Sequence, residues 1–278
     1  MTAAALPQPA AAGRCATIPA MPRFAANVSM LFTERPLLER VGAAARAGFA
    51  AVEVQFPYEA TVEDWRAALR AAGLPLVVHN LPAGDWASGE RGIACHPDRV
   101  AEFRDGVARA LDYARALAVP RLNVIAGVAP PHVPAVEARQ VLVDNLRWAA
   151  RALQPYGIQL LLEPINTYDV AGFFIHRTAQ ALEVLDAVGE PNVALQYDIY
   201  HAQRMEGELI GTLRRQRARI GHVQIADNPG RHEPGSGEIA WSAVLGELDR
   251  LGYDGWVGCE YRPRTTTEEG LAWLKAWT

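Results

Sequence analysis

The sequence has only three cysteines and a single lysine, and it has no long uninterrupted apolar stretch. The cysteines are too few and too widely spaced for a disulfide framework, so a reducing cytoplasm is the expected location. No apolar run approaches the roughly 18 residues of a membrane-spanning helix, so no membrane association is expected. The 27 basic and 31 acidic residues give a net charge of −4, which does not favour a nucleic-acid partner.

The first residues of the chain have a different composition from the rest. Residues 1–21 are mostly alanine, proline and other small residues, with Arg14 as their only charged side chain. They lack the basic start and leucine-rich stretch of a signal peptide. Such a composition cannot repay the entropic cost of ordering. We therefore expect a disordered tail over residues 1–22 and one folded domain over residues 23–278.

Short apolar runs alternate with amphipathic helical patterns through the predicted domain. The predicted strands are 24–28, 51–54, 76–80, 121–125, 158–163, 193–198, 220–225 and 256–261. The predicted helices are 37–47, 62–72, 98–118, 134–156, 178–188, helical sequence from the sixth strand to about 217, 241–251 and 267–277. Eight strand–helix units predict an α/β fold, a single (β/α)8 TIM barrel. The rival open sheet usually carries a glycine-rich phosphate loop, and neither a GxGxxG nor a Walker motif occurs.

Oxygen-bearing side chains stand at the ends of four successive predicted strands: Glu163, Asp198, Gln224 and Glu260. These ends meet at the rim where TIM barrels carry their active sites. Three carboxylates gathered there must be neutralised, paired or metal-bound. Oxygen ligands suit Mg²⁺ or Mn²⁺, and the lack of thiolates argues against structural zinc. The rim therefore predicts a divalent cation site, although each acid taken alone could simply cap a helix or pair with an arginine.

Several longer motifs surround these positions. They are HNLPAGDW at 79–86 with GERG at 89–92, EPIN at 163–166, and QIADNPGR at 224–231 running into EPGSGE at 233–238. With these motifs the chain from Arg23 onward resembles the hydroxypyruvate isomerase family, within the xylose isomerase-like superfamily of TIM barrels.

The resemblance implies a divalent metal held by the four strand-end residues, and conversion of hydroxypyruvate to tartronate semialdehyde through an enediolate. It also implies that Glu163 and Glu260 form the acid/base pair. Their strands lie across the rim from each other, so the two can flank a small substrate, whereas Asp198 only binds metal. Epimerase relatives carry histidine where Gln224 stands, and the amide is expected to bind metal more weakly.

A 2-oxo acid substrate carries a carboxylate, which needs a cationic partner and preferably a guanidinium. The single lysine, Lys275, is poorly placed for this in the last predicted helix. The loop 81–96 is long enough either to act as a lid or to pack as a rigid excursion. The candidate substrate-binding residues are His79, Trp86, Arg91, His201 and Arg231. Each also has a purely structural interpretation, as a loop tether, a helix-start histidine or a core aromatic residue.

Other functions remain open at this point. The substrate could be a four-carbon 2-oxo acid of the 2-oxo-tetronate type, or the reaction could be epimerisation of a ketose at carbon 3; pocket length would separate these. A metal-dependent DNA-repair endonuclease would need more histidines for several zinc ions, and a basic groove. A barrel that only binds a ligand would not need competent residues at all four rim positions.

Overall fold

Eight parallel strands pair in chain order, and β1 also pairs with β8, which closes the sheet into a barrel. The structure is a computed structural model that describes residues 22–277. The strands are β1 (Arg23–Asn27), β2 (Ala51–Val54), β3 (Leu76–Asn80), β4 (Arg121–Val124), β5 (Gln159–Leu162), β6 (Val193–Asp198), β7 (Ile220–Ile225) and β8 (Trp256–Cys259). The predicted TIM barrel is therefore confirmed, while the predicted tail lies outside the described residues except for Pro22.

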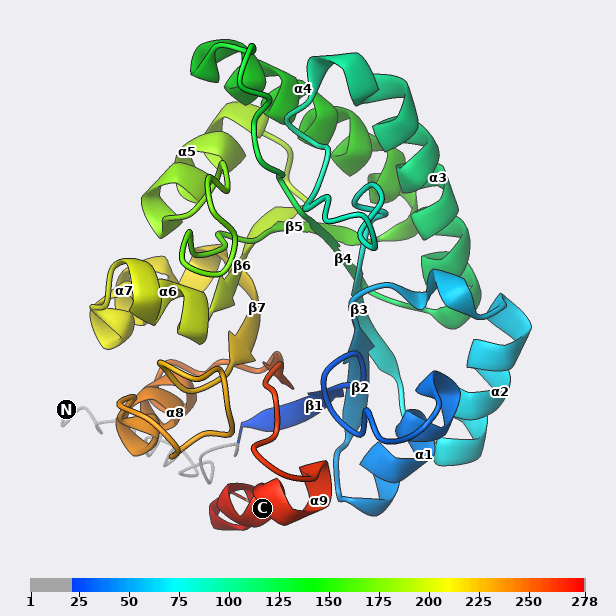
Figure 1. The fold of residues 1–278 in the computed structure, drawn as a ribbon, viewed down its shortest axis with the longest axis vertical. Helices are drawn as coiled ribbons and strands as arrows, with labels where there is room; N and C mark the ends of the chain where they lie inside the picture. The colour runs from blue at the N-terminus through cyan, green and yellow to red at the C-terminus, as the bar shows by residue number, and fades with distance from the viewer. Residues whose placement is uncertain (1–21, 278) are drawn as a thin grey trace, which may run out of the picture.

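The helices surround the ring of strands (Figure 1). The α-helices are α1 (Leu37–Arg46), α2 (Val62–Ala72), α3 (Val100–Leu117), α4 (Ala135–Leu153), α5 (Thr178–Val188), α6 (Ile199–Met205), α7 (Leu209–Gln216), α8 (Trp241–Arg250) and α9 (Thr267–Gly270). The 3-10 turns are η1 (Pro57–Glu59), η2 (Pro97–Arg99), η3 (Gln154–Tyr156), η4 (Arg217–Arg219) and η5 (Leu271–Ala276).

Two predicted helices differ from the structure. The helical sequence after β6 divides into α6 and α7, because Gly207 and Glu208 both adopt left-handed backbone conformations. The closing helix is one α-helical turn, α9, continued by the 3-10 turn η5. Neither change moves the strand ends that form the rim.

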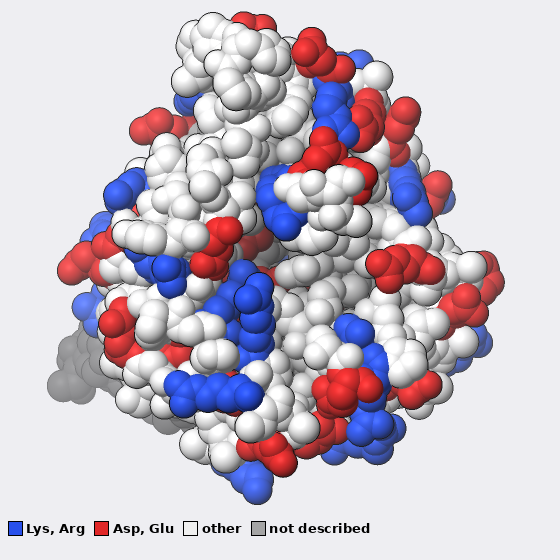
Figure 2. Space-filling model, in the orientation of Figure 1, with Lys and Arg blue, Asp and Glu red and all other residues white. Residues whose placement is uncertain are grey.

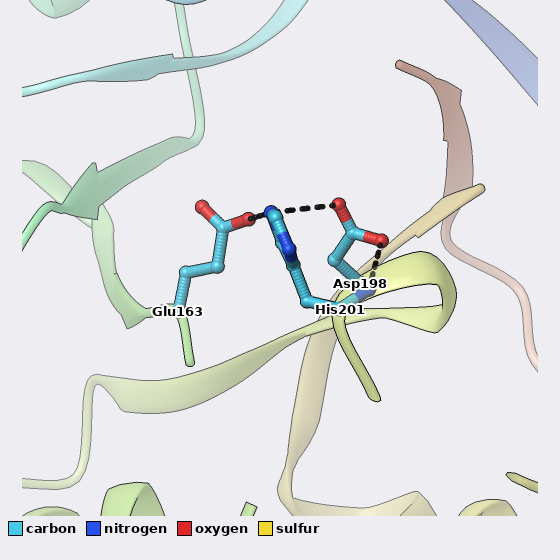
Figure 3. Close-up of side chains that lie close together, drawn as sticks. All are labelled: Glu163, Asp198 and His201. Carbon is cyan, nitrogen blue, oxygen red and sulfur yellow. Dashed lines mark hydrogen bonds and ion pairs between the residues drawn. The ribbon is translucent and has the colours of Figure 1, made fainter. Parts of the chain in front are cut away.

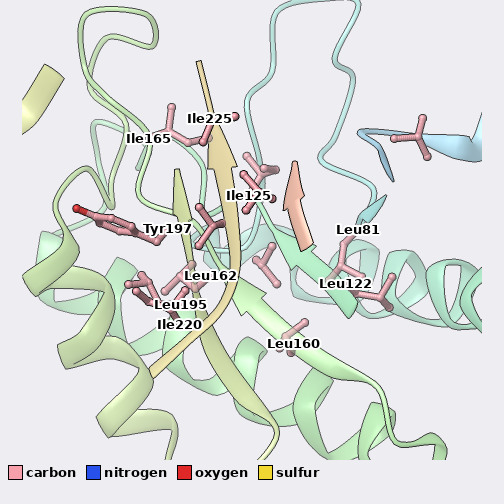
Figure 4. Packing of buried hydrophobic residues seen from close by; sticks show 14 of the residues in the cluster. Leu81, Leu122, Ile125, Leu160, Leu162, Ile165, Leu195, Tyr197, Ile220 and Ile225 are labelled. Atoms are coloured by element: carbon pink, nitrogen blue, oxygen red, sulfur yellow. The ribbon is translucent and has the colours of Figure 1, made fainter. Parts of the chain in front are cut away.

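Side chains alternate along the strands between the two sides of the barrel wall. Outward residues such as Leu122, Leu162 and Tyr197 belong to the large buried cluster shared with the helices (Figure 4). Cys259 also belongs to this cluster, so it faces away from the neighbouring Glu260. Cys95 and Cys259 are buried free thiols. Within residues 22–277, no helix combines the length and hydrophobicity needed to cross a membrane.

The long loop after β3 packs against the loop after β4. Cys95 N donates to Ala126 O at 3.0 Å, and Gly92 crosses the backbone of Gly127 so closely that no side chain fits. A Cβ at Gly92 would lie 2.3 Å from Ile125 O. These contacts favour a rigidly packed loop 81–96 over a hinged lid.

A substitution at Gly92 tests this packing. Gly92→Ala is expected to lower the free energy of unfolding by about 1–3 kcal/mol, since it adds a steric clash to a left-handed backbone conformation. Chemical denaturation measures the loss. Gly89→Ala is the matched control, because Gly89 has a similar φ of 95° but open space around its Cβ position. An equal loss in both variants would contradict the close approach.

Candidate active site

The four predicted rim residues are all buried and come from neighbouring strands. Asp198 ends β6, Gln224 lies in β7, and Glu163 and Glu260 directly follow β5 and β8. Their exposed fractions are 2% to 5%. Strand alternation turns these side chains inward, opposite to the apolar residues that precede them.

Glu163 and Asp198 lie on either side of the His201 ring (Figure 3). His201 Nε2 is 3.8 Å from Glu163 Oε1 and 3.7 Å from Asp198 Oδ2. The other oxygen of each carboxylate is held from behind. Glu163 Oε2 accepts from Asn123 and Gln196, both at 2.9 Å, and Asp198 Oδ1 caps the start of α6. The two free oxygens therefore face the same imidazole.

Glu260 is paired with the predicted substrate-binding residue Arg231. Arg231 Nη2 donates to Glu260 Oε2 at 2.6 Å and lies 3.8 Å from Asp198 Oδ2. Glu260 Oε1 accepts from Asn27 and Gln55 at 3.0 Å and 2.9 Å. Although burial opposes the charge on Arg231, the surrounding carboxylates, that of Glu260 foremost, raise its pKa.

Asp227 holds the loop that carries Arg231. Its carboxylate accepts from the backbone N–H groups of Asn228, Gly235 and Ile239, and from the Trp241 indole N–H. Arg231 itself has a left-handed φ of 54°. The motif after β7 therefore forms a turn built around one buried acid, and this turn aims Arg231 at the rim.

Burial dominates the protonation of the rim groups. It raises the pKa of Glu163 well above its usual range, and the nearby Glu260 and Asp198 carboxylates raise it further. Burial also raises the pKa of Asp198 to about 7, although Arg231 opposes the shift. The pKa of His201 falls well below its usual range because burial, and then Arg231, disfavour the charged ring. Burial therefore favours the neutral imidazole of His201, whose Nδ1 accepts from Asn166 Nδ2 at 2.6 Å.

A divalent cation fits these residues. Asp198 Oδ2 is buried and has no hydrogen-bond partner among the residues described. A buried carboxylate oxygen without a partner is costly, and a cation would satisfy it. Glu163, Asp198 and His201 offer ligand atoms within 4.8 Å of one another, and no other group of this kind occurs among residues 22–277. Carboxylate oxygens are the ligands that suit hard divalent cations.

A cavity of about 520 Å³ opens above these groups. Figure 2 shows a hollow near the middle of this face, with acidic and basic side chains at its edge. The predicted site residues that line the cavity are Trp86, Arg91, Glu163, His201, Arg231 and Glu260. The structure therefore brings both proposed acid/base residues to one cavity, together with four of the five candidate substrate-binding residues.

The residues from the loop after β3 form one wall of this cavity. The Arg91 guanidinium lies 4.3 Å from the Trp86 ring centroid, and the Trp86 ring packs 5.0 Å from that of Phe56. Arg91 also donates to Trp86 O and to Glu90 O. Through these hydrogen bonds Arg91 stabilises the conformation of the loop, and it also lines the cavity.

His79 is the predicted substrate-binding residue that does not line the cavity. It is fully buried, its Nδ1 lies 3.1 Å from Asn80 O, and burial lowers its pKa to about 4. Its Nε2 has no partner among the described residues. A direct contact between His79 and a substrate remains a prediction. The burial of His79 outside the cavity lining does not support it.

Gln224 lies beside the cluster in a buried polar network that sequence reasoning missed. Its Nε2 donates to Glu53 Oε1, and its Oε1 accepts from Gln196 Nε2, both at 2.7 Å. The sequence does carry a signal for this network, in the form of isolated polar residues inside apolar strands. Gln196 and His222 each lie two residues before a rim residue and therefore share its inward face. His222 Nε2 lies 2.7 Å from Glu53 Oε2 in the same network.

Comparison with known proteins agrees with this architecture. Residues 41–277 match the family model described as xylose isomerase-like TIM barrel. The chain is 51% identical to hydroxypyruvate isomerase of Escherichia coli K12 over 254 residues, which are 91% of this chain and 98% of that protein. It is 46% identical to 2-oxo-tetronate isomerase of Cupriavidus necator over 92% of this chain and 98% of that protein.

A solved structure from Brucella melitensis, titled an AP endonuclease of family 2, superposes with a TM-score of 0.90. It is 44% identical to this chain and covers 92% of this chain and 99% of that one. Solved sugar epimerases superpose at identities of 19–23%, which shows a shared fold alone. These similarities and the rim geometry together lead to one conclusion: the chain is an isomerase that belongs to the hydroxypyruvate isomerase family of xylose isomerase-like TIM barrels.

Proposed function

We propose that this protein converts hydroxypyruvate to tartronate semialdehyde in a reaction that depends on a divalent metal ion, Mg²⁺ or Mn²⁺. The observation that carries the proposal is the meeting of Glu163 and Glu260 at one cavity, beside Asp198 and His201. The similarity to a hydroxypyruvate isomerase supports the choice of substrate. We place the reaction in the cytoplasm.

The reaction moves one hydrogen between adjacent carbons. The base removes a proton from the hydroxymethyl carbon, and the conjugate acid of the pair delivers a proton to the former ketone carbon. The hydroxyl proton moves to the neighbouring oxygen, so the product is an isomer of the substrate. A bound divalent cation supplies Lewis-acid stabilisation of the enediolate charge. Glu163, Asp198, Gln224 and Glu260 would hold that cation, and His201 would contact the substrate.

Before a cation binds, burial favours the protonated forms of the two glutamates. Burial raises the pKa of Glu163 and of Glu260 above the ordinary value of a carboxyl group. A carboxyl group with a raised pKa is a stronger base when ionised and can exist protonated nearer neutral pH.

Arg231 is the proposed partner of the substrate carboxylate. Arg231 lines the cavity, and its Nε has no hydrogen-bond partner among the described residues. Arg231→Ala is expected to raise KM by about 10- to 100-fold, the loss of one hydrogen bond to a charged group. Steady-state kinetics with hydroxypyruvate measures this. An unchanged KM would assign the substrate carboxylate to Arg91 or to a histidine instead.

A panel of substrates tests the proposed function. Hydroxypyruvate, four-carbon 2-oxo acids and ketoses are incubated in deuterated water, with and without added Mg²⁺ or Mn²⁺, and NMR follows deuterium incorporation and product. We expect cation-dependent exchange and isomerisation of hydroxypyruvate. Exchange that occurs only with ketoses would replace the proposal by epimerisation.

A four-carbon 2-oxo acid is the second candidate substrate. The similarity to 2-oxo-tetronate isomerase favours it, and a cavity of about 520 Å³ is larger than a three-carbon acid needs. A DNA-repair endonuclease is disfavoured by the net charge of −4 and by the single candidate metal cluster among residues 22–277.

A further inference from the structure

Glu53 lies at the centre of a buried network below the candidate active site. Its side chain on β2 is fully buried. Its Oε1 accepts hydrogen bonds from Asn27 Nδ2 at 2.9 Å and from Gln224 Nε2 at 2.7 Å, while its Oε2 is hydrogen-bonded to His222 Nε2 at 2.7 Å. Three polar side chains from β1 and β7 therefore depend on one carboxylate, and no solvent can replace it.

The barrel makes room for this carboxylate at Gly258 on β8. A Cβ at Gly258 would lie 2.1 Å from Glu53 Oε2 and 2.5 Å from its Cδ. The backbone of Gly258 is not in the left-handed region that favours glycine, since it is absent from the glycines with positive φ. The position therefore lacks a side chain because the Glu53 carboxylate occupies the space.

Glu53 also determines which way the Gln224 amide faces. A carboxylate oxygen that accepts from this amide must meet its NH2 end, so the carbonyl oxygen is turned away from Glu53. That oxygen faces Gln196 Nε2 at 2.7 Å, and the same Nε2 donates to Glu163 Oε2 at 2.9 Å. Only the carbonyl end of an amide can bind a hard cation. The orientation imposed by Glu53 therefore turns the carbonyl oxygen of Gln224 toward Gln196, which also holds Glu163 Oε2.

We propose that Glu53 is a positioning residue that turns the Gln224 carbonyl oxygen toward the cation-binding carboxylates, with Gly258 providing its space. Asn27 donates to both Glu53 Oε1 and Glu260 Oε1. Through Asn27, Glu53 therefore also helps to position Glu260. This inference rests on the proposed metal-dependent function. Glu53 acts only through its neighbours and does not line the cavity formed by the described residues.

Calorimetric titration with Mn²⁺ tests the proposal without a substrate. Glu53→Met fills the space beside Gly258 but removes the acceptor, and it is expected to weaken Mn²⁺ binding by about 10- to 100-fold. Glu53→Gln keeps a carbonyl oxygen that can accept from Asn27 and Gln224, and it should stay within about threefold of the wild type. Equal affinities of Glu53→Met and the wild type would overturn the proposal, as would equal weakening in both variants.

Two further variants keep the test independent of folding. Gly258→Ala retains the glutamate but displaces its carboxylate, and it should weaken Mn²⁺ binding as Glu53→Met does; wild-type affinity would overturn the proposal. Glu247→Gln changes a buried glutamate on α8 that pairs with Arg214 at 2.8 Å, so it should lower the melting temperature and leave Mn²⁺ affinity unchanged. Absence of Mn²⁺ binding in the wild type would instead contradict the metal-dependent function itself.

Discussion

Glu163→Gln and Glu260→Gln are each expected to lower kcat by about 10²- to 10⁴-fold, the usual contribution of a general acid or base. Glutamine keeps the size and one acceptor oxygen of each side chain, so the hydrogen bonds from Asn123 and Gln196 to position 163 can persist. Each variant loses the carboxyl group that accepts and donates the proton. Steady-state kinetics and deuterium exchange into hydroxypyruvate measure both variants.

A matched control separates proton transfer from general damage. Glu190→Gln removes a carboxylate that pairs with Arg151 at 2.6 Å after α5, outside the cavity, and it should leave kcat unchanged. Both active-site variants should give the far-ultraviolet circular dichroism of the wild type. If either active-site variant retained full activity, that glutamate would have no acid/base role.

Removal of the cation is expected to produce the second large effect. After dialysis against a chelator the protein should lose turnover, because the Lewis acid is gone and the buried acids tend to take up protons. Burial holds the pKa of Asp198 at about 7 when no cation is bound, so an appreciable fraction is protonated at neutral pH. Added Mn²⁺ should restore activity and, at a hundred times its Kd, stabilise the fold by about 2.7 kcal/mol.

Thermal unfolding and metal analysis measure this second effect together. The melting temperature should rise with Mn²⁺ concentration in the wild type. In Asp198→Asn, which weakens the ligand but keeps the size of the side chain, the rise should be smaller. Full turnover by protein shown to contain less than stoichiometric metal would contradict metal dependence.

The barrel could be predicted from the sequence because each of its units is a local pattern. Apolar runs of four to six residues, followed by amphipathic segments, mark every strand and most helices, and the acids after β5 and β8 stand where those runs end. The break between α6 and α7 was missed, although Gly207 marks it, because the helical pattern resumes directly afterwards.

Contacts across the barrel could not be predicted in the same way. Glu53 and His222 are 169 residues apart, and they meet only because the closed sheet brings β2, β8 and β7 around one interior. Which residues meet there depends on the stagger of the strands, which no single strand encodes. The Arg231–Glu260 pair likewise depends on the path of a loop folded around Asp227. Residue types at strand ends were therefore predictable, whereas their partners were not.

On the proposed function, the rim carboxylates hold a divalent cation in the cavity that Glu163 and Glu260 both line. An anomalous difference map from a crystal of the protein grown with Mn²⁺ and hydroxypyruvate tests it most directly. We expect one strong peak at Glu163 and Asp198, with the substrate lying between Glu163 and Glu260. Substrate in the cavity without a peak there, or with the peak elsewhere, would rule out a cation held by these carboxylates.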